Sequence, residues 1–274
     1  LAQQVLRKSN KNLKFITTLH GTDITLVGLE PSFMPLVKFS IEESNGVTAV
    51  SRFLKEKTLT NYNIQKDIEV LYNFIDVDKY SRQNSEIFRK HIAPNGEKVL
   101  VHTSNFRPVK RVVDTIRILD KVKKEIPTKL LLIGDGPDRS ECEHLTRELD
   151  LQKDVIFLGK QDGLVEILSA SDLFLMPSQS ESFGLSALEA MACEVPVVST
   201  SVGGLPELVI HNETGYIAEI GDVDRMAKYA IELLTNEKRY KTFSKNSRER
   251  AVKHFDKNSI VPKYVEYYEK ILNS

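Results

Sequence analysis

The stretch LFLMPSQSESFGLSALEAMACEVPVVST, residues 173–200, contains the pattern that decides the fold. Two short apolar runs, LFLMP and PVVST, flank a polar loop and a segment that predicts a helix from about Ser182 or Phe183. A strand that is buried on both faces has no alternation of apolar and polar residues, so each run predicts a strand of a parallel sheet. A strand, a helix and a second strand in this order form a βαβ unit.

The same rhythm extends over most of the chain. Further apolar runs that predict strands are FITTL (15–19), VTAVS (47–51), IEVLYN (68–73), VLVHTS (99–104), KLLLIG (129–134) and VIFLG (155–159). The pattern predicts an α/β protein with parallel sheets. The polar residues 76–96 interrupt it and indicate a domain boundary. We therefore expect a Rossmann-like domain over 1–80 that is truncated at its N-terminus, a complete doubly wound domain over 97–255, and a C-terminal helix over 256–274 that returns toward the first domain.

Composition limits the classes of function. Of the 274 residues, 38 are Lys or Arg and 38 are Asp or Glu, so no net field favours nucleic acid or an anionic membrane. No apolar run approaches the roughly 20 residues that span a bilayer. Only two cysteines, Cys142 and Cys193, argue against disulfide and zinc frameworks and favour a cytoplasmic setting. The first residues lack a signal-peptide layout, and we expect the chain to begin inside a domain.

Two glutamates in the opening stretch are candidates for ligand binding. In open α/β sheets, ligands bind beyond the carboxyl ends of the strands. Glu181 is expected at the mouth of the helix, and Glu189 about 12 Å along it, so the pair is too far apart for acid–base work on one bond. Their alternative roles are offsetting the helix dipole and facing solvent. The backbone amides at the helix mouth suit a diphosphate; they belong to Ser182, Phe183, Gly184 and Leu185.

Two other loops follow predicted strands. The loop SNFRPVKR carries Arg107, Lys110 and Arg111, which form either a phosphate clamp or a solvated basic turn. The turn Gly159-Lys160-Gln161 is placed to present backbone groups to a base edge.

Three further motifs give weaker evidence of a ligand or metal site. The third glycine of a dinucleotide fingerprint starting at Gly134 falls on Arg139, so we reject an NAD site. The triplets Asp76–Asp78 and Asp222–Asp224 precede helical patterns, so we expect helix caps and no metal. His20 follows the strand FITTL, where it is either a structural residue or part of a site.

Together these residues resemble the retaining glycosyltransferases of the GT-B fold, in which two Rossmann-like doubly wound sheets face a cleft. The resemblance covers the chain from residue 13 onward and rests on two glutamates with seven residues between them and on SNFRPVK, LIGDGP, FLGKQD and STSVGGLPELV. The segments TTLHGTDIT, YNFID, SNFRPVKR and FLGKQD are similar to members that transfer N-acetylglucosamine from its UDP sugar to L-malate and so open bacillithiol biosynthesis.

The resemblance implies roles for individual residues. Glu189 is expected to hold the ribose hydroxyls of UDP, Glu181 to contact the transferred sugar, and Lys110 to bind the diphosphate. His20 is expected near the donor sugar. Asn105 stands where the family has an arginine, which leaves neutralisation to Lys110 with help from Arg107 or Arg111. Glu194 replaces a glycine that ends the helix, at a cost of about 1 kcal/mol if its backbone is left-handed.

The resemblance also implies a mechanism without a cofactor or metal. We expect front-face substitution, in which the departing diphosphate takes the proton of the acceptor while Lys110 stabilises the charge. The expected partners are a UDP-sugar and a small-molecule acceptor, with Thr22 and Lys38 as acceptor-binding candidates. The family's N-terminal glycine-rich loop is absent from these residues, so we expect them to be inactive alone.

Several alternatives stay open. They are a related transferase with a lipid or polysaccharide acceptor, a UDP-sugar epimerase of similar fold, and a nucleotide-sugar-binding module without turnover. The sequence also leaves open whether the protein forms a homo-oligomer.

Overall fold

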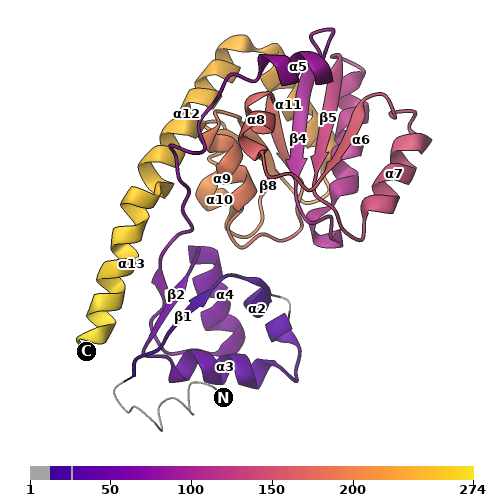
Figure 1. The fold of residues 1–274 in the computed structure, drawn as a ribbon. Coiled ribbons are helices and arrows are strands. Elements are labelled where there is room, and N and C mark those ends of the chain that lie inside the picture. The colour runs from indigo at the N-terminus through magenta and orange to yellow at the C-terminus, as the bar shows by residue number, and fades with distance from the viewer. Residues whose placement is uncertain (1–12, 26) are drawn as a thin grey trace. The chain divides into compact units, whose positions relative to one another are not determined.

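The computed structural model describes residues 13–25 and 27–274. The chain divides into two compact units, shown in Figure 1. Unit 1 comprises the described residues up to Phe74 together with Lys257–Ser274, and unit 2 comprises Ile75–Asp256. The polar residues 76–96, at which the sequence indicates a boundary, belong to unit 2.

Unit 1 contains a parallel sheet of the order β1-β2-β3. Its elements are β1 (Ile16–Leu19), α2 (Thr22–Thr25), the 3-10 helix η1 (Val27–Leu29), α3 (Met34–Glu43), β2 (Gly46–Ala49), α4 (Arg52–Tyr62), β3 (Glu69–Val70) and α13 (Lys257–Leu272). The last helix is bound to the sheet through tyrosines, since the Tyr267 hydroxyl contacts the backbone of Val47 and the Tyr264 hydroxyl donates to the Leu71 carbonyl. A side chain at Gly46 would collide with the Tyr267 hydroxyl, so glycine permits this close packing.

Unit 2 is a doubly wound domain around a six-stranded parallel sheet of the order β6-β5-β4-β7-β8-β9. Its strands are β4 (Lys98–Thr103), β5 (Thr128–Ile133), β6 (Val155–Gly159), β7 (Leu173–Met176), β8 (Val197–Thr200) and β9 (Gly215–Ala218). Its helices are α5 (Glu86–Ile92), η2 (Pro108–Lys110), α6 (Val112–Lys123), α7 (Arg139–Glu148), α8 (Leu164–Ser169), α9 (Leu185–Ala192), α10 (Leu205–Leu208), α11 (Val223–Thr235) and α12 (Glu237–Phe255). These findings confirm the predicted α/β class with parallel sheets.

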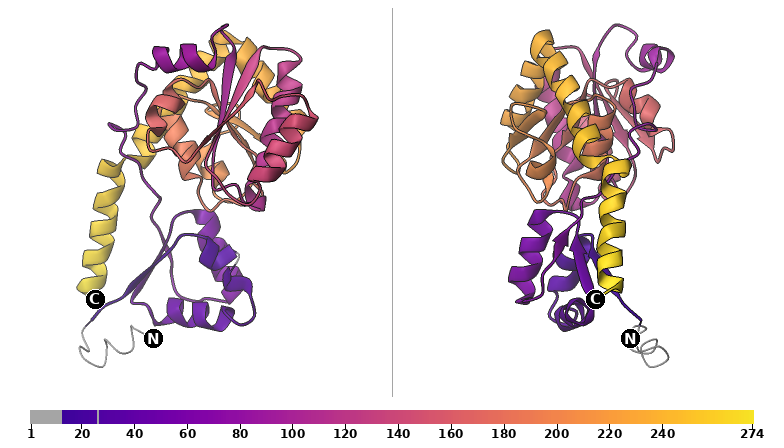
Figure 2. Two further views of the ribbon diagram at one scale, coloured as in Figure 1. Left: turned by 45° about the vertical axis from the view of Figure 1, so that its right-hand side comes forward. Right: turned by 90° about the vertical axis from the view of Figure 1, so that its left-hand side faces the viewer.

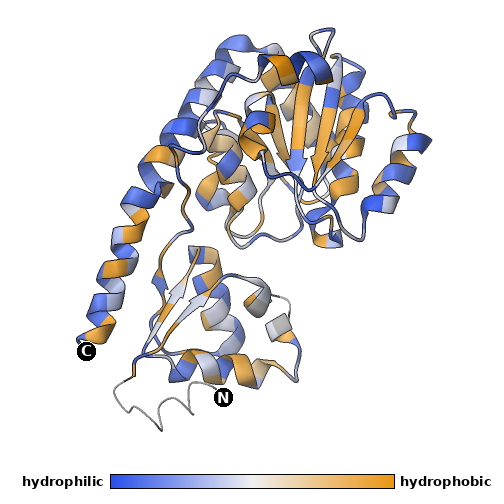
Figure 3. Ribbon diagram, viewed as in Figure 1, coloured by the Kyte–Doolittle hydropathy of each residue, from blue (hydrophilic) through white to orange (hydrophobic). Residues whose placement is uncertain are grey.

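The strands of unit 2 are buried on both sides. Alternate residues such as Leu100 and Leu132 form one core with α6, α7 and α11, while Val101 and Leu131 are also fully buried. Figure 3 shows the strands as the most hydrophobic part of this unit. The uninterrupted apolar runs in the sequence reflect this double burial.

Three local predictions need correction. The helix expected from Ser182 or Phe183 begins at Leu185, because Gly184 is left-handed with φ of 101° and ends the preceding turn. The segment after Asp76 is a turn and not a helix; the Asp76 carboxylate accepts the amides of Asp78 and Lys79 at 3.1 Å each.

The third correction is β9, a strand that the sequence did not predict. Its short run of residues contains glycine and alanine and lacks a long apolar signal.

Two other local predictions concern single residues. Asp222 caps α11 by accepting the Arg225 amide at 2.9 Å, as expected. Glu194 is left-handed with φ of 62°, the conformation in which a glycine is favoured.

No helix in the described part of the chain combines the length and apolarity that crossing a bilayer requires. Cys142 and Cys193 are free and buried. Figure 2 shows the same elements from two further sides.

Candidate active site

The order of the strands places a ligand site in unit 2. The chain passes from β4 to β5 and β6 on one side, then crosses to β7 on the other side of β4. Strand order therefore reverses between β4 and β7, and the crevice beyond the carboxyl ends of such strands is the usual ligand site of open α/β sheets. The loop after β4 carries Lys110, and the loop after β7 carries Glu181.

Lys110 and Glu181 meet at this switch point. The Lys110 ammonium donates to Oε1 of Glu181 at 2.7 Å, and the Ser178 hydroxyl donates to the same oxygen at 2.8 Å. The side chain of Glu181 is 9% exposed and that of Lys110 is 22% exposed. A carboxylate that is buried to this degree requires such compensation. The backbone joins the two loops as well, since the Gln179 amide donates to the Val109 carbonyl at 2.7 Å.

A buried histidine, His102, anchors the loop after β4. The Nδ1 atom of His102 lies 2.8 Å from the Leu175 carbonyl, which accepts only, so Nδ1 carries the proton. Nε2 then accepts from the Ser104 hydroxyl at 2.8 Å, and the Ser104 oxygen accepts the Phe106 amide at 3.3 Å. Burial and, to a smaller extent, the charge of Lys110 lower the pKa of His102 to about 4, although the hydrogen bond to the Leu175 carbonyl acts to raise it.

Two glycines after β5 allow a close approach to this loop. A Cβ atom at Gly134 would lie 1.8 Å from the Ser104 carbonyl oxygen, and one at Gly136 would lie 2.0 Å from that of Asn105. The motif Gly134-Asp135-Gly136 is therefore the tight strand-to-helix turn that the sequence predicts, and its glycines support the loop that carries Lys110.

The turn before α9 is formed by close backbone contacts. Phe183 is buried and packs edge-on against Phe255 at 5.5 Å between ring centroids. Gly203 has φ of 58°, and a Cβ atom there would lie 1.7 Å from the Glu181 carbonyl oxygen; the same oxygen accepts the Gly204 amide. Among the hydrogen bonds of the described residues, none uses the amides of Gly184 and Leu185. Because both amides lie at a helix N-terminus, they are free to bind an anion.

Glu189 lies in α9 and is half-buried. Burial raises its pKa, whereas hydrogen bonding to the Tyr80 hydroxyl and the charge of Lys79 act to lower it. Burial and the negative charge of Glu189 raise the pKa of Tyr80 to about 12. Tyr80, from a distant part of the sequence, is therefore near enough to Glu189 for each group to shift the pKa of the other.

The other predicted cations of the clamp differ in their surroundings. Arg111 donates to the buried carboxylate of Asp114 at 2.6 Å, and Arg117 donates to the second oxygen of that carboxylate at 2.9 Å. Arg107 is exposed and has no ion pair within the residues that the structure describes, and Asn105 is exposed beside it. Of the two arginines proposed to help Lys110, Arg107 is the one not engaged by a carboxylate.

The remaining predicted donor residues, Lys160 and Gln161, lie at the carboxyl end of β6, two strands away from β4. Both are exposed, and the Gln161 amide nitrogen donates to the Leu158 carbonyl at 2.6 Å. The hydrogen bonds and ion pairs of the described residues do not connect them to Lys110 or Glu181. Their contact with a base stays a prediction.

The predicted residues of unit 1 lie on short elements after β1. His20 is exposed between β1 and α2, and Thr22 is the exposed first residue of α2. Lys38 lies on α3, is 37% exposed and pairs with Glu42 at 3.7 Å. Their roles toward the donor sugar and the acceptor stay predictions.

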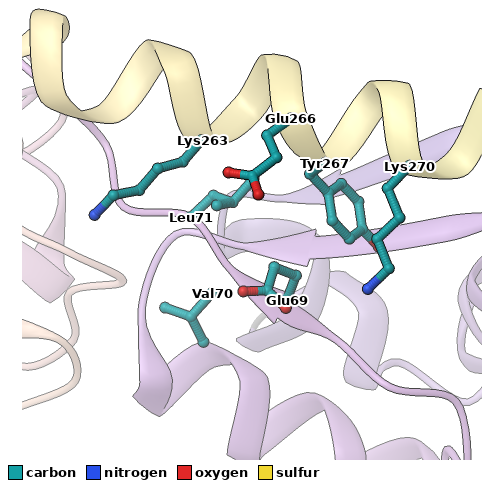
Figure 4. A pocket seen from close by; sticks show the side chains of 7 residues that line it. All are labelled: Glu69, Val70, Leu71, Lys263, Glu266, Tyr267 and Lys270. Atoms are coloured by element: carbon teal, nitrogen blue, oxygen red, sulfur yellow. The ribbon is translucent and has the colours of Figure 1, made fainter.

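No group of three or more His, Cys, Asp or Glu residues that suits a metal ion is found among the residues that the structure describes. A cavity of about 420 Å³ lies in unit 1 between β3 and α13. Figure 4 shows its charged side chains, which include Glu69, Lys263, Glu266 and Lys270. None of the predicted site residues lines it, and its acidic and basic groups alternate, so it does not define a phosphate site.

Sequence reasoning missed three residues of this arrangement. Ser178 lies three residues before Glu181, and its position in the polar loop after a strand was a usable signal. His102 is inside an apolar run, where it resembles a core residue. Tyr80 precedes Glu189 by more than a hundred residues, and nothing in its local sequence indicates that the two groups shift each other's pKa.

The fold and the position of this site define the GT-B class. The chain aligns with the crystal structure of Anabaena HepE in complex with UDP and glucose, at a TM-score of 0.89 and 21% identity, over 98% of this chain and 74% of that one. It also aligns with sucrose-phosphate synthase from Thermosynechococcus elongatus, at a TM-score of 0.83 and 23% identity, over 99% of this chain and 71% of that one. At these identities the likeness concerns the fold alone, and it confirms the predicted GT-B architecture of two Rossmann-like domains.

The sequence comparisons show the family. Residues 83–250 match Glycosyl transferases group 1, and residues 2–79 match Glycosyltransferase Family 4. The chain is 43% identical over 273 residues to the N-acetyl-alpha-D-glucosaminyl L-malate synthase of Bacillus anthracis, which covers 99% of this chain and 71% of that protein. The chain belongs to the group 1 glycosyl transferase family, and the predicted resemblance to glycosyltransferases is confirmed.

Proposed function

We propose that the protein transfers N-acetylglucosamine from UDP-N-acetylglucosamine to the hydroxyl of L-malate, with retention at the anomeric carbon, as the first step of bacillithiol synthesis. The observation that carries the proposal is the 43% identity to an N-acetyl-alpha-D-glucosaminyl L-malate synthase over 99% of the chain. Identity at this level over nearly the whole of this chain supports the same donor and acceptor.

The geometry of unit 2 supports a nucleotide-sugar donor. Glu189 accepts the ribose hydroxyls, the free amides of Gly184 and Leu185 bind the diphosphate, and Lys110 neutralises it. Arg107 is exposed and not paired with a carboxylate of the described residues, so it replaces the charge that Asn105 does not supply. Lys160 and Gln161 provide the edge of the base site in this proposal.

Catalysis proceeds by front-face substitution. Glu181 is bound to Lys110 and Ser178 and is therefore a sugar-positioning group and not a free nucleophile. The leaving diphosphate accepts the proton of the malate hydroxyl, while Lys110 and the N-terminus of α9 stabilise its developing charge. His20 contacts the donor sugar, and no metal ion takes part.

The acceptor is a small dianion and requires cationic or hydroxyl groups. Thr22 is exposed at the start of α2, and the ion pair of Lys38 within the described residues is with an exposed helix neighbour at 3.7 Å, so both are available to a carboxylate. Exposed pairs of this kind contribute about 0–1 kcal/mol, so an incoming dianion displaces Glu42 readily. We place the reaction in the cytoplasm.

The test is UDP release from UDP-N-acetylglucosamine by the full-length protein, with and without L-malate. Release that depends strictly on malate, with an α-linked product by NMR, supports the proposal. Slow release that malate does not change would retain the transferase and indicate another acceptor, such as a lipid or polysaccharide. UDP binding without any release would favour a binding module instead.

A further inference from the structure

We propose that Ser178 is a positioning residue for the transferred sugar. Its hydroxyl holds Oε1 of Glu181, and this keeps Oε2 in the orientation that accepts from the sugar while Lys110 binds the diphosphate. This inference rests on the proposed function, which assigns the sugar to Glu181 and the diphosphate to Lys110. It adds a residue that is fully buried and therefore acts through Glu181 and not on the donor itself.

Both side chains that donate to Glu181 bind the same oxygen of its carboxylate. The Lys110 ammonium lies 2.7 Å from Oε1, and the Ser178 hydroxyl lies 2.8 Å from it. None of the hydrogen bonds and ion pairs of the described residues ends on Oε2. The enclosed side-chain oxygens without a partner in this part of the chain belong instead to Thr103, Ser199, Tyr240 and Asp256. Among these residues Oε2 is therefore unbound and open, as an acceptor for a sugar hydroxyl must be.

The two donors respond differently to a bound diphosphate. An ammonium has three protons and a full charge, so the diphosphate competes with Glu181 for Lys110. The Ser178 hydroxyl has one proton and no charge, and the residue is 0% exposed. The diphosphate cannot reach this hydroxyl, so its bond to Oε1 persists when the donor is bound. Ser178 is then the group that fixes the orientation of the carboxylate.

The backbone that carries Ser178 is attached to β8 and to the turn that follows β8. The Thr200 hydroxyl, at the end of β8, donates to the Ser178 carbonyl at 2.6 Å. The Glu181 carbonyl accepts the Gly204 amide at 3.1 Å. Both ends of the segment that joins the two side chains are thus held, so a single hydrogen bond between them determines where the carboxylate points.

The test measures how strongly the full-length protein prefers UDP-N-acetylglucosamine over its 3-deoxy, 4-deoxy and 6-deoxy sugar analogues. The preference is the ratio of kcat/KM values in the malate-dependent reaction, and the wild type should show it for at least one analogue. In Ser178→Ala this preference should fall about tenfold, because kcat/KM decreases for the natural donor only. The dissociation constant for UDP, which has no sugar, should change less than about threefold. An unchanged preference would overturn the inference.

Two variants separate hydrogen bonding from packing and stability. Ser178→Cys fills nearly the same space but keeps only a weak donor, so the preference should fall as in Ser178→Ala. Ser171→Ala removes another fully buried serine hydroxyl of unit 2, which donates to the Ile167 carbonyl at 2.8 Å, and should leave the preference unchanged. A preference that Ser178→Cys retains would assign the effect to packing, and one that Ser171→Ala loses would assign it to stability. Either result overturns the inference.

Glu181→Gln distinguishes this inference from the proposed function. The amide oxygen stays with Lys110 and Ser178, so the amide nitrogen takes the place of Oε2 and the preference should be lost. If it is lost in Glu181→Gln and intact in Ser178→Ala, the role of Ser178 is overturned and the function stands. If Glu181→Gln retains both the preference and malate-dependent release, Glu181 does not bind these hydroxyls, so the inference is overturned and the transfer reaction stands. If the wild type releases no UDP with malate, the proposed function fails and the inference fails with it.

Discussion

The Lys110 ammonium and the Glu181 carboxylate meet at 2.7 Å, although they are 71 residues apart in the sequence. Each comes from a loop at the carboxyl end of a strand, and the two strands, β4 and β7, are neighbours only because the strand order reverses there. The proposed function has Lys110 bind the diphosphate as well. Glu181 then loses part of its compensating charge when the donor arrives, which frees it to accept hydroxyls of the sugar.

Lys110→Gln should weaken UDP binding roughly ten- to hundredfold, because charge-assisted hydrogen bonds to the diphosphate are lost. It should also lower the free energy of unfolding by roughly 1–3 kcal/mol, since Glu181 remains buried without its cation. Calorimetric titration with UDP and urea unfolding measure the two effects. Lys129→Gln, which removes a half-buried lysine paired with Asp154 at 3.0 Å, should reduce stability and leave UDP binding unchanged. Unaltered UDP affinity in Lys110→Gln would exclude the assigned role.

Gly203→Ala should destabilise unit 2 by roughly 2–4 kcal/mol, from left-handed strain and overpacking together. The added Cβ atom would lie 1.7 Å from the Glu181 carbonyl oxygen, so the loop that carries Glu181 must shift and turnover should fall with it. Thermal unfolding and the rate of UDP release measure this. Gly163→Ala is the control, since a Cβ atom there meets nothing within 4 Å and φ is −89°. Equal stability of the two variants would contradict the steric argument.

The free energy of unfolding should fall as the pH falls, because His102 is held neutral in the folded protein. Its folded pKa of about 4 lies below the value of about 6.5 expected for an unfolded chain, so the unfolded state binds more protons between these values. The contribution is fully present above about pH 6.5 and is lost as the pH falls toward 4, by about 3 kcal/mol in total. Urea unfolding of the wild type and His102→Asn over this range measures it. A decline of the same size in both proteins would show that other groups cause it; the exposed His144 offers a control substitution.

Lys38→Gln should raise KM for L-malate at least fivefold and leave KM for the UDP-sugar unchanged, because one charge–carboxylate contact is removed. Steady-state kinetics with each substrate varied in turn test this. Lys55→Gln removes a lysine of the same unit that is paired with Asp67 at 3.0 Å, and it should change neither constant. A KM for malate that Lys38→Gln does not alter would remove Lys38 from the acceptor site.

Much of the fold follows from local sequence. Runs such as LLLI in β5 and LFLM in β7 identify strands because both faces of a parallel sheet are buried, and this burial is recorded in the residue types. β9 was not predicted because Gly215 and Ala218 carry no strand signal of their own. Their conformation comes from pairing with β8. The start of α9 was predicted too early because Ser182 and Phe183 are compatible with a helix. The left-handed backbone of Gly184 prevents the helix from beginning before Leu185.

The features of the candidate site likewise separate into those that local sequence predicts and those that depend on the tertiary structure. The sequence by itself determined that Glu181 and Lys110 lie in loops after strands, since strand ends can be read from local apolar runs. Only the tertiary structure decided that they form an ion pair, that Arg111 is engaged by Asp114, and that Ser178 donates to Glu181. These contacts depend on strand order, which joins residues far apart in the chain. Local propensity describes each segment separately and contains no information about which distant side chain completes a buried charge.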